Sequence, residues 1–397
     1  MSGDRVIFTV RVDAAESVFL VGSFNAWSET NPLEMMSENV WQTSLSVDGI
    51  KDGDSYKFKV RLKGEEIYLA DPCAPEYDGA PYHNSVYRDM QIGKVCPLEI
   101  KCGEQCLPVN IFSVRADEFY DRREHTYKSR EIIPYMMQMG FTHLCISEIF
   151  EEYFDFALSM TIKGSFAPKR ELGGIEKLRE MISVMHKFGI GVLLDCGDSD
   201  MRDGNAKYWL EFYGFDGIMS SADFDGVRET LFGACQAQRG ECESSSCNLQ
   251  NAMSSMSYLL VSSGVGYAGA RLSSNGVRYL DGLLSEKDES VFELFLSDLN
   301  ALYLTESCLW RDNGERFKDE FGGALIAKCQ DDEKIVIFAA DTTGQGCEIY
   351  FPTSESLRVA LDSHSQRYGG EIRMPRKIGD RLRLDPYQSV ILIGEKP

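Results

Sequence analysis

Short apolar segments alternate with amphipathic helical patterns between residues 108 and 312, and this alternation restricts the fold more than any other feature. The near-continuous apolar runs typical of buried parallel strands are PVNIFSV, FTHLCISEI, IGVLLDC and FDGIMSS. Helical patterns lie between them, and in the longest, LGGIEKLREMISVMHKFG, apolar residues recur every three or four positions from Ile175 to Met185. The pattern predicts a parallel sheet covered by helices.

The residues on either side of this region have the pattern of β-sheet proteins. Apolar or alternating segments lie between Gly, Asn and Asp turn signals, as in RVIFTVRV, SVFLVGSF and DSYKFKVRL at one end and KIVIFAAD and QSVILIG at the other. Such spacing predicts a small β-sandwich at each end. The expected architecture is multidomain α/β plus β, with domains at residues 1–95, 105–312 and 318–397.

The charge and the cysteine content of the chain restrict the classes of partner and cofactor that we expect it to bind. A formal net charge of −21 argues against nucleic acid or an anionic membrane as a partner, whereas a neutral polymer such as a glucan would not be repelled. No leader pattern or membrane-length apolar run is seen, so we expect a cytoplasmic chain with reduced thiols. The Cys102/Cys106 and Cys242/Cys247 spacings differ from the common zinc pattern and no His is near, so neither a metal nor another cofactor is expected.

Several of these segments resemble the glycogen (1,4-α-glucan) branching enzymes of the α-amylase superfamily, glycoside hydrolase family 13. VFLVGSFNAW, followed by YKFKV and LADPCA, is similar to the carbohydrate-binding module that precedes the barrel in that family. HKFGIGVLLD and WLEFYGFDGI resemble barrel segments, and ALDSHSQRYGG resembles the terminal sandwich. The resemblance implies an immunoglobulin-like N-terminal β-sandwich, a (β/α) TIM-type barrel and a C-terminal β-sandwich.

The resemblance also implies that the barrel is truncated and its catalytic positions altered. After Asp223 the chain is too short for the three further strands, the acid/base Glu and the His-Asp pair of the family. On the nucleophile strand, Met219 takes the place of the family Arg and Ser221 that of the nucleophile. Elsewhere, Asp200 falls on a family His and Met160 on a sugar-stacking Tyr. A serine without a base cannot replace the carboxylate that a retaining transfer requires.

Two carboxylates remain as candidates for catalysis. Asp195 follows the third barrel-like strand, where a structural strand-end role is the alternative. Asp223 has the same strand parity as Ser221, but a shift of two residues moves its carboxylate by roughly 6–7 Å, more than reactive placement tolerates. We therefore predict that neither residue is catalytic.

The N-terminal module carries the candidate glucan-binding residues. Trp27, Lys57, Tyr68 and Asn84 match the positions at which related modules stack on glucose units and bind their hydroxyls. Aromatic rings suit the apolar faces of pyranoses, and Lys and Asn donate hydrogen bonds to hydroxyls. The alternative is that Trp27 and Tyr68 only pack at the edge of the sandwich.

Three hypotheses of function follow. The first is a catalytically inactive branching-enzyme-like protein that binds α-glucan or serves as a scaffold or regulatory partner of an enzyme of glycogen metabolism. The second is an active branching enzyme, or a related α-glucan transferase or hydrolase, that uses the displaced carboxylate of Asp223. The third is a structural assembly protein, a homo-oligomer in which a second copy covers the sheet edges that a truncated barrel exposes.

Overall fold

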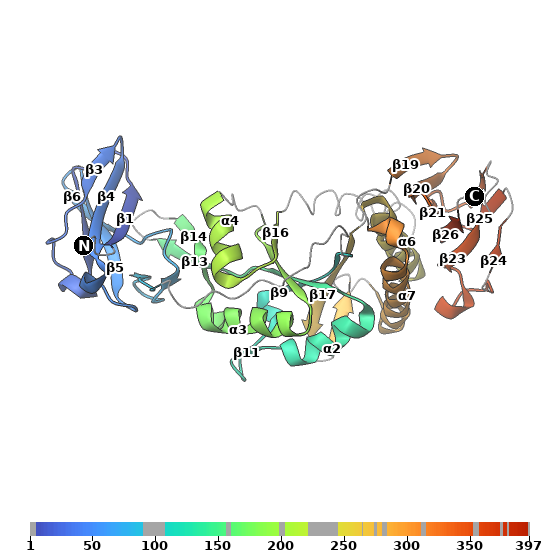
Figure 1. The fold of residues 1–397 in the computed structure, drawn as a ribbon, viewed down its shortest axis with the longest axis horizontal. Coiled ribbons are helices and arrows are strands. Elements are labelled where there is room, and N and C mark those ends of the chain that lie inside the picture. The colour runs from blue at the N-terminus through green and yellow to red at the C-terminus, as the bar shows by residue number, and fades with distance from the viewer. Residues whose placement is uncertain are drawn as a thin grey trace.

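Two β-sandwiches flank a central α/β unit along the long axis of the protein, with the N-terminal sandwich at one end and the C-terminal sandwich at the other (Figure 1). The structure is a computed structural model that describes residues 5–89, 108–155, 160–197, 203–220, 245–263, 265–273, 276–279, 284–310, 315–351, 357–373, 376–378 and 381–395. The exact domain boundaries remain those predicted from the sequence, at residues 1–95, 105–312 and 318–397.

The N-terminal unit is the β-sandwich that the sequence predicts. One sheet has the order β1-β4-β3, with strands β1 (Arg5–Arg11), β4 (Val40–Ser46) and β3 (Glu34–Ser37). The other has the order β2-β5-β8-β7, with strands β2 (Ser17–Gly22), β5 (Ser55–Leu62), β8 (Ser85–Val86) and β7 (Glu76–Tyr77), and β6 (Glu65–Leu69) also pairs with β5. Alternation along β5 buries Tyr56, Phe58 and Val60 in the core, so the intervening side chains face outward.

The central sheet has the order β16-β15-β12-β9-β17-β18. Its strands are β9 (Asn110–Arg115), β12 (His143–Ser147), β15 (Gly191–Asp195), β16 (Gly217–Met219), β17 (Gly266–Ser273) and β18 (Gly276–Tyr279). The first five strands in that order pair in parallel, and β18 pairs antiparallel with β17. The sheet is consistent with a truncated barrel, because β17 pairs directly with β9 although only four of the parallel strands precede it in the chain.

Helices pack against this sheet, and the last two of them in the chain lie between it and the C-terminal sandwich (Figure 1). They are α2 (Ser129–Met139), α3 (Gly174–Lys187), α4 (Asp203–Tyr208), α6 (Ser245–Ser263) and α7 (Glu286–Thr305), and a π-helical turn (Trp209–Tyr213) follows α4. Helix α3 buries its apolar face from Ile175 to Met185, as the spacing predicts. Strand β17 extends to Ser273 and pairs with β18 through its last residues.

An antiparallel hairpin joins the N-terminal sandwich to the α/β unit. Its strands are β13 (Phe150–Asp155) and β14 (Met160–Pro168). The ring centroids of Tyr77 in the sandwich and Tyr153 in the hairpin lie 4.9 Å apart, and His83 stacks on Tyr153 at 5.5 Å. Gly164 permits this approach, because a Cβ there would lie 2.7 Å from the Tyr77 ring. The hairpin fixes the sandwich to the α/β unit through apolar contact.

The C-terminal unit is the second predicted sandwich. Its large sheet has the order β19-β20-β21-β26-β23-β24, with strands β19 (Glu315–Phe321), β20 (Ala324–Gln330), β21 (Lys334–Asp341), β26 (Ser389–Glu395), β23 (Arg358–Asp362) and β24 (Arg376–Lys377). One face of this sheet packs on β22 (Cys347–Tyr350) and β25 (Arg381–Leu384), which pair with each other. Its other face shares the main hydrophobic core with α6 and α7.

A buried histidine lies at the start of β12. The ring of His143 packs against the backbone of Gly191, where a Cβ would lie only 2.4 Å from the imidazole, and its Nδ1 is 2.8 Å from Oγ1 of Thr142. Burial lowers the pKa of His143 below 6.5, and the carboxylate of Asp216 offsets this only in part. The folded protein therefore holds this ring neutral at a pH where the unfolded chain protonates it.

The unfolding free energy is accordingly expected to fall as the pH drops below about 6.5, by at most about 1.4 kcal/mol per pH unit from this group. The sign follows because a depressed histidine pKa gives stability that is complete above the unfolded pKa and is lost below it. Urea titrations between pH 7.5 and 5.5 measure the slope, and His143→Gln should flatten it. His125→Gln, in an exposed loop, is the matched control; equal slopes for His143→Gln and wild type would refute the prediction.

Candidate functional site

The carboxyl ends of the parallel strands are where enzymes with (β/α) barrels hold their active sites. Here these strand ends carry Arg115 on β9, Ser147 on β12, Asp195 on β15 and Met219 on β16. Asp195 and Met219 are register partners on neighbouring strands. This edge is therefore the first place to look for catalytic chemistry.

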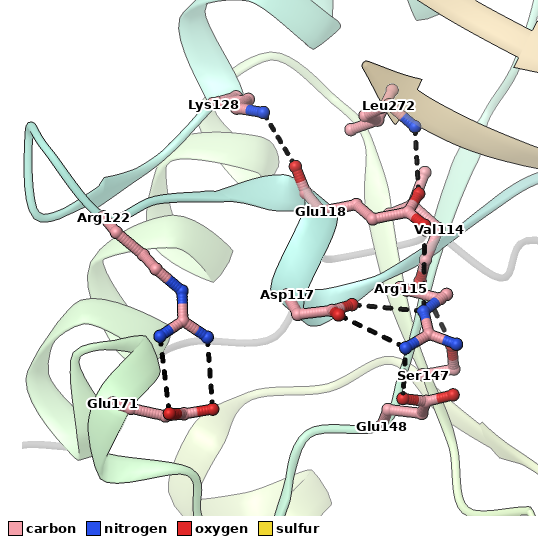
Figure 2. A network of polar contacts seen from close by, with 10 residues as sticks. All are labelled: Val114, Arg115, Asp117, Glu118, Arg122, Lys128, Ser147, Glu148, Glu171 and Leu272. Atoms are coloured by element: carbon pink, nitrogen blue, oxygen red, sulfur yellow. Dashed lines mark hydrogen bonds and ion pairs between the residues drawn. The ribbon is translucent and has the colours of Figure 1, made fainter. Parts of the chain in front are cut away.

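An ion-pair network centred on Arg115 occupies part of this edge (Figure 2). The guanidinium binds both carboxylate oxygens of Asp117, each at 3.2 Å, and lies 2.9 Å from Glu148 and 3.8 Å from Glu118. The hydrogen bonds from this guanidinium, helped by its positive charge, hold the pKa of Asp117 below the usual range. Glu148 follows β12 with a φ of 57°, a left-handed conformation that is uncommon for a residue with a side chain.

Further hydrogen bonds attach the network to the sheet. The Glu118 side chain accepts a hydrogen bond from the backbone N–H of Leu272 on β17 at 3.0 Å, and its carbonyl accepts one from Lys128 at 2.8 Å. Ser147 donates to the carbonyl of Val114 at 3.4 Å. Figure 2 shows the side chains from these separate elements converging on Arg115 and helix α1 (Ala116–Phe119). The arrangement ties β9, β12 and β17 together and commits the arginine to carboxylates of this chain.

Two of the positions considered in the sequence analysis, Asp195 and Met219, have structural partners on the described strands. The Asp195 carboxylate accepts a hydrogen bond from the backbone N–H of Gly197 at 2.8 Å, as a strand-end cap does. The Met219 sulfur lies 3.9 Å from that of Cys145, beside an apolar cluster that includes Leu193. Met219 therefore presents a thioether at this strand end.

The other residues considered in the barrel-like segments add no further group to this strand-end edge within the described residues. The carboxylate of Asp216, the second residue of FDGIM, accepts a hydrogen bond from the N–H of Val192 at 2.7 Å and lies 2.9 Å from Nε2 of His186. Met160 begins β14 opposite Asp155. Three predicted positions lie outside the described residues: Asp200, Ser221 and Asp223.

The turn that carries Trp27 is held in an unusual conformation. Ala26 and Trp27 follow the 3-10 turn Ser23–Asn25 and both have left-handed φ values, 52° and 59°. The Asn25 amide donates to the carbonyls of Leu20 and Ser28, and its oxygen accepts from the N–H of Gly22. These bonds offset the strain of the turn and leave the Trp27 side chain 40% exposed.

The other three predicted binding residues lie around the outer face of β5. Lys57 is on β5 and donates to the carbonyl of Tyr82 at 2.7 Å. Tyr68 on β6 is 43% exposed, and the Lys59 ammonium lies 5.7 Å from its ring centroid. The Asn84 amide donates to Asp78 at 2.7 Å, so part of its hydrogen-bonding capacity is used within the loop.

The structure thus places Lys57 and Tyr68 on one sheet, Asn84 in the loop just before strand β8 of that sheet, and Trp27 near the end of the adjacent strand β2. Sequence reasoning missed Tyr82, which is 71% exposed and adjoins Lys57. Its only sequence signal is its position two residues before Asn84.

Other site types find no support in the described part of the chain. No group of three or more His, Cys, Asp or Glu side chains there could hold a metal ion. The cysteines described with their side chains are free thiols: Cys73, Cys145, Cys196, Cys308, Cys329 and Cys347. Cys102, Cys106 and Cys242 lie outside the described residues, as does the side chain of Cys247. No described helix combines the length and apolar character needed to cross a membrane.

Comparison with known proteins agrees with this organisation. Residues 1–74 match the family carbohydrate-binding module 48 (isoamylase N-terminal domain). Over 205 residues the chain is 28% identical to the 1,4-alpha-glucan branching enzyme GlgB of Jannaschia sp. (strain CCS1), and over 195 residues it is 27% identical to GlgB 1 of Streptomyces avermitilis. The matches cover 48% and 47% of this chain but only 29% and 23% of those enzymes.

Solved structures extend the similarity to the whole fold. The pullulanase type I of Bacillus subtilis str. 168, complexed with maltose, superposes with a TM-score of 0.64 at 13% identity over 100% of this chain and 85% of its own. The pullulanase of Anoxybacillus sp. LM18-11, complexed with maltotetraose, gives 0.62 at 12% identity over 99% and 86%. The chain is thus similar to 1,4-alpha-glucan branching enzymes over about half of its length, its residues 1–74 match carbohydrate-binding module 48, and its overall fold is that of the pullulanase structures.

Proposed function

We propose that this protein binds α-glucan through its N-terminal module and does not itself catalyse the branching transfer. The observation that carries the proposal is the end of β16, where Met219 packs beside Cys145 and Leu193 and Ser221 follows in the sequence. A retaining transfer needs an ionised nucleophilic carboxylate next to a second carboxyl group. The thioether supplies no charge to stabilise such a carboxylate.

The Arg115 network supports the same conclusion. A cation at this edge could assist catalysis only if its charge acted on a substrate or on a catalytic carboxylate. Arg115 is instead paired with Asp117, Glu118 and Glu148, which together exceed its charge. The paired side chains stabilise the strand ends, so we assign the network a structural role.

The binding half of the proposal rests on the module. The module carries three exposed aromatic side chains, Trp27, Tyr68 and Tyr82, and a lysine, Lys57, a combination that suits the apolar faces and the hydroxyls of glucose units. Maltose and maltotetraose are the ligands named for the two pullulanase structures, and the sequence relatives are glucan-branching enzymes. A neutral glucan is also compatible with the net charge of −21.

The wider role that we propose is that of a scaffold or regulatory partner in glycogen metabolism, acting as a homo-oligomer or with a partner enzyme. We place it in the cytoplasm, a compartment that suits the free thiols of the described cysteines. Binding to glycogen would concentrate such a protein on the substrate of its partner enzyme without any chemistry of its own.

Incubation with amylose is expected to yield no new α-1,6 branches. Branch-chain analysis after debranching, together with iodine staining, measures this, with an active 1,4-α-glucan branching enzyme assayed in parallel. Branch formation that disappears in Asp223→Asn while the variant stays folded would establish the alternative, an enzyme that uses the displaced carboxylate. Branch formation that survives in Asp223→Asn would reject both ideas.

A further inference from the structure

A cavity of about 710 Å³ lies between helix α7 and the C-terminal sandwich, away from both sites described above. Asp298, Ala301 and Leu302 on α7 form one wall. The opposite wall is formed by the end of β23 and the 3-10 turn Gln366–Tyr368 that follows it. Its volume is in the range of clefts that hold small ligands.

Ion-pair and aromatic contacts fix the two walls relative to each other. Arg367 pairs with both carboxylate oxygens of Asp298, and the Tyr368 hydroxyl donates to the same carboxylate at 2.7 Å. The rings of Phe295 and Tyr368 meet edge to face at 5.1 Å. Gln250 from α6 donates to a carbonyl of the sandwich at 3.3 Å. The cavity is therefore preformed, and a ligand would not have to create it.

The lining is balanced in charge and mixed in polarity. It contains two arginines, Arg367 and Arg373, and two aspartates, Asp298 and Asp362, so its formal charge sums to zero. Hydroxyl and amide groups of Ser365 and other residues lie beside an apolar strip formed by Ala301, Leu302, Ala360 and Leu361. Planar side chains that donate and accept hydrogen bonds, next to a small apolar surface, suit a neutral polyhydroxylated ring.

We propose that this cavity is a second carbohydrate site, which takes a short segment or chain end of an α-glucan. The proposal rests on the α-glucan function proposed above and adds a place on the molecule separate from the module. An anionic ligand fits less well, because the arginines are matched by aspartates and the protein carries a net charge of −21. Two sites at separate places on one chain would raise the avidity for a branched polymer.

Two side chains of the cavity are suited to a test. Neither Gln366 nor Arg373 makes a side-chain hydrogen bond or ion pair within the part of the chain that the structure describes, so Gln366→Ala with Arg373→Ala should leave the fold intact. Arg383→Ala is the matched control, because this exposed arginine lies on β25, in the other sheet of the same sandwich. Ala301→Trp is a second variant, which fills the cavity from an exposed position of α7. Thermal unfolding of each variant checks its fold.

The experiment is calorimetric titration of the full chain with maltotetraose. Wild type should bind at two sites and Trp27→Ala at one. Adding Gln366→Ala and Arg373→Ala, or Ala301→Trp, to Trp27→Ala should weaken the remaining site at least tenfold, whereas adding Arg383→Ala should not. Loss of all binding in Trp27→Ala alone would overturn the cavity proposal and leave the module function standing.

Other outcomes separate the two proposals further. Binding that the cavity variants abolish and Trp27→Ala does not change would support the cavity and reject the module. No binding of maltotetraose to wild type would reject both. Inorganic phosphate is the probe for the competing ligand class: phosphate binding that Arg373→Ala abolishes, with no effect on maltotetraose, would overturn the carbohydrate assignment.

Discussion

Replacing Trp209 with alanine is expected to lower the free energy of unfolding by about 3–5 kcal/mol. The side chain is fully buried, its ring stacks on Tyr213 with centroids 4.5 Å apart, and it meets Phe150 edge to face at 5.3 Å. Its Nε1 donates to the carbonyl of Ser165 at 2.9 Å. The substitution removes these contacts and leaves a cavity that rigid neighbours fill only in part. Urea denaturation followed by circular dichroism measures the loss.

Two further variants make this prediction specific. Trp209→Phe keeps an aromatic ring but loses the hydrogen bond to Ser165, so a smaller loss of about 1–3 kcal/mol is expected. Phe188→Ala removes an aromatic residue that is 56% exposed and should change stability by no more than about 0.5 kcal/mol. If Trp209→Ala were as stable as Phe188→Ala, the aromatic cluster would not be what holds the approach to β16 in place.

The role of Trp209 shows what the WLEFYGFDGI segment contributes to the fold. Phe215, the residue before Asp216, packs edge to face on Trp209 at 5.9 Å, and Asp216 caps the neighbouring strand through the N–H of Val192. Both residues support the sheet. Sequence similarity in this segment can therefore reflect conserved packing without a conserved activity. Only the residues at the strand end can show whether the catalytic groups are present.

Periodicity predicts the local elements well, because each depends on a few neighbouring residues. The apolar face of α3 and the strands β9, β12, β15 and β16 lie where the pattern places them. The pairing of β17 with β9 has no local signal, since it joins residues far apart in the chain. It depends on close approach: a Cβ on Gly266 would lie 2.1 Å from the side chain of Asn110.

The hairpin β13–β14 shows a similar limit. Its segments mix aromatic, charged and small residues, so neither period dominates the sequence. Packing against the N-terminal sandwich determines its position, through Tyr153 and Ala167 on the hairpin and Tyr77 on the sandwich. Tertiary contacts thus determine the structure of this segment, which its β-propensity alone does not specify.

The candidate sites also differ in whether they depend on local sequence or on long-range contacts. The candidate binding residues of the module are proposed from motif positions, because turns and strands such as GSFNAW and YKFKV are short and local. The Arg115 network was missed, because Glu148 is distant in sequence from Arg115 and Glu118 and nothing in RADEF indicates a third carboxylate. Only the adjacency of β9 and β12 brings these charges together.

Replacing Trp27 with alanine is expected to weaken glycogen binding by about tenfold, which corresponds to about 1.4 kcal/mol. The ring is 40% exposed at the tip of a turn that Asn25 holds in place, so it is preorganised to stack on a glucose unit. Alanine adopts the left-handed backbone at this position no less readily than tryptophan. The unfolding free energy should therefore change by no more than about 0.5 kcal/mol. Co-sedimentation with glycogen and affinity electrophoresis in glycogen-containing gels measure the binding.

Two variants separate stacking from general loss of apolar surface. Trp27→Phe retains a flat ring and should keep most of the affinity, whereas Met36→Ala, which alters a residue 62% exposed on the opposite sheet of the module, should keep all of it. Asn25→Ala should weaken binding through the turn and also lower stability, because its amide joins Leu20, Ser28 and Gly22. Equal glycogen binding by Trp27→Ala and wild type would mean that Trp27 does not contact the glucan.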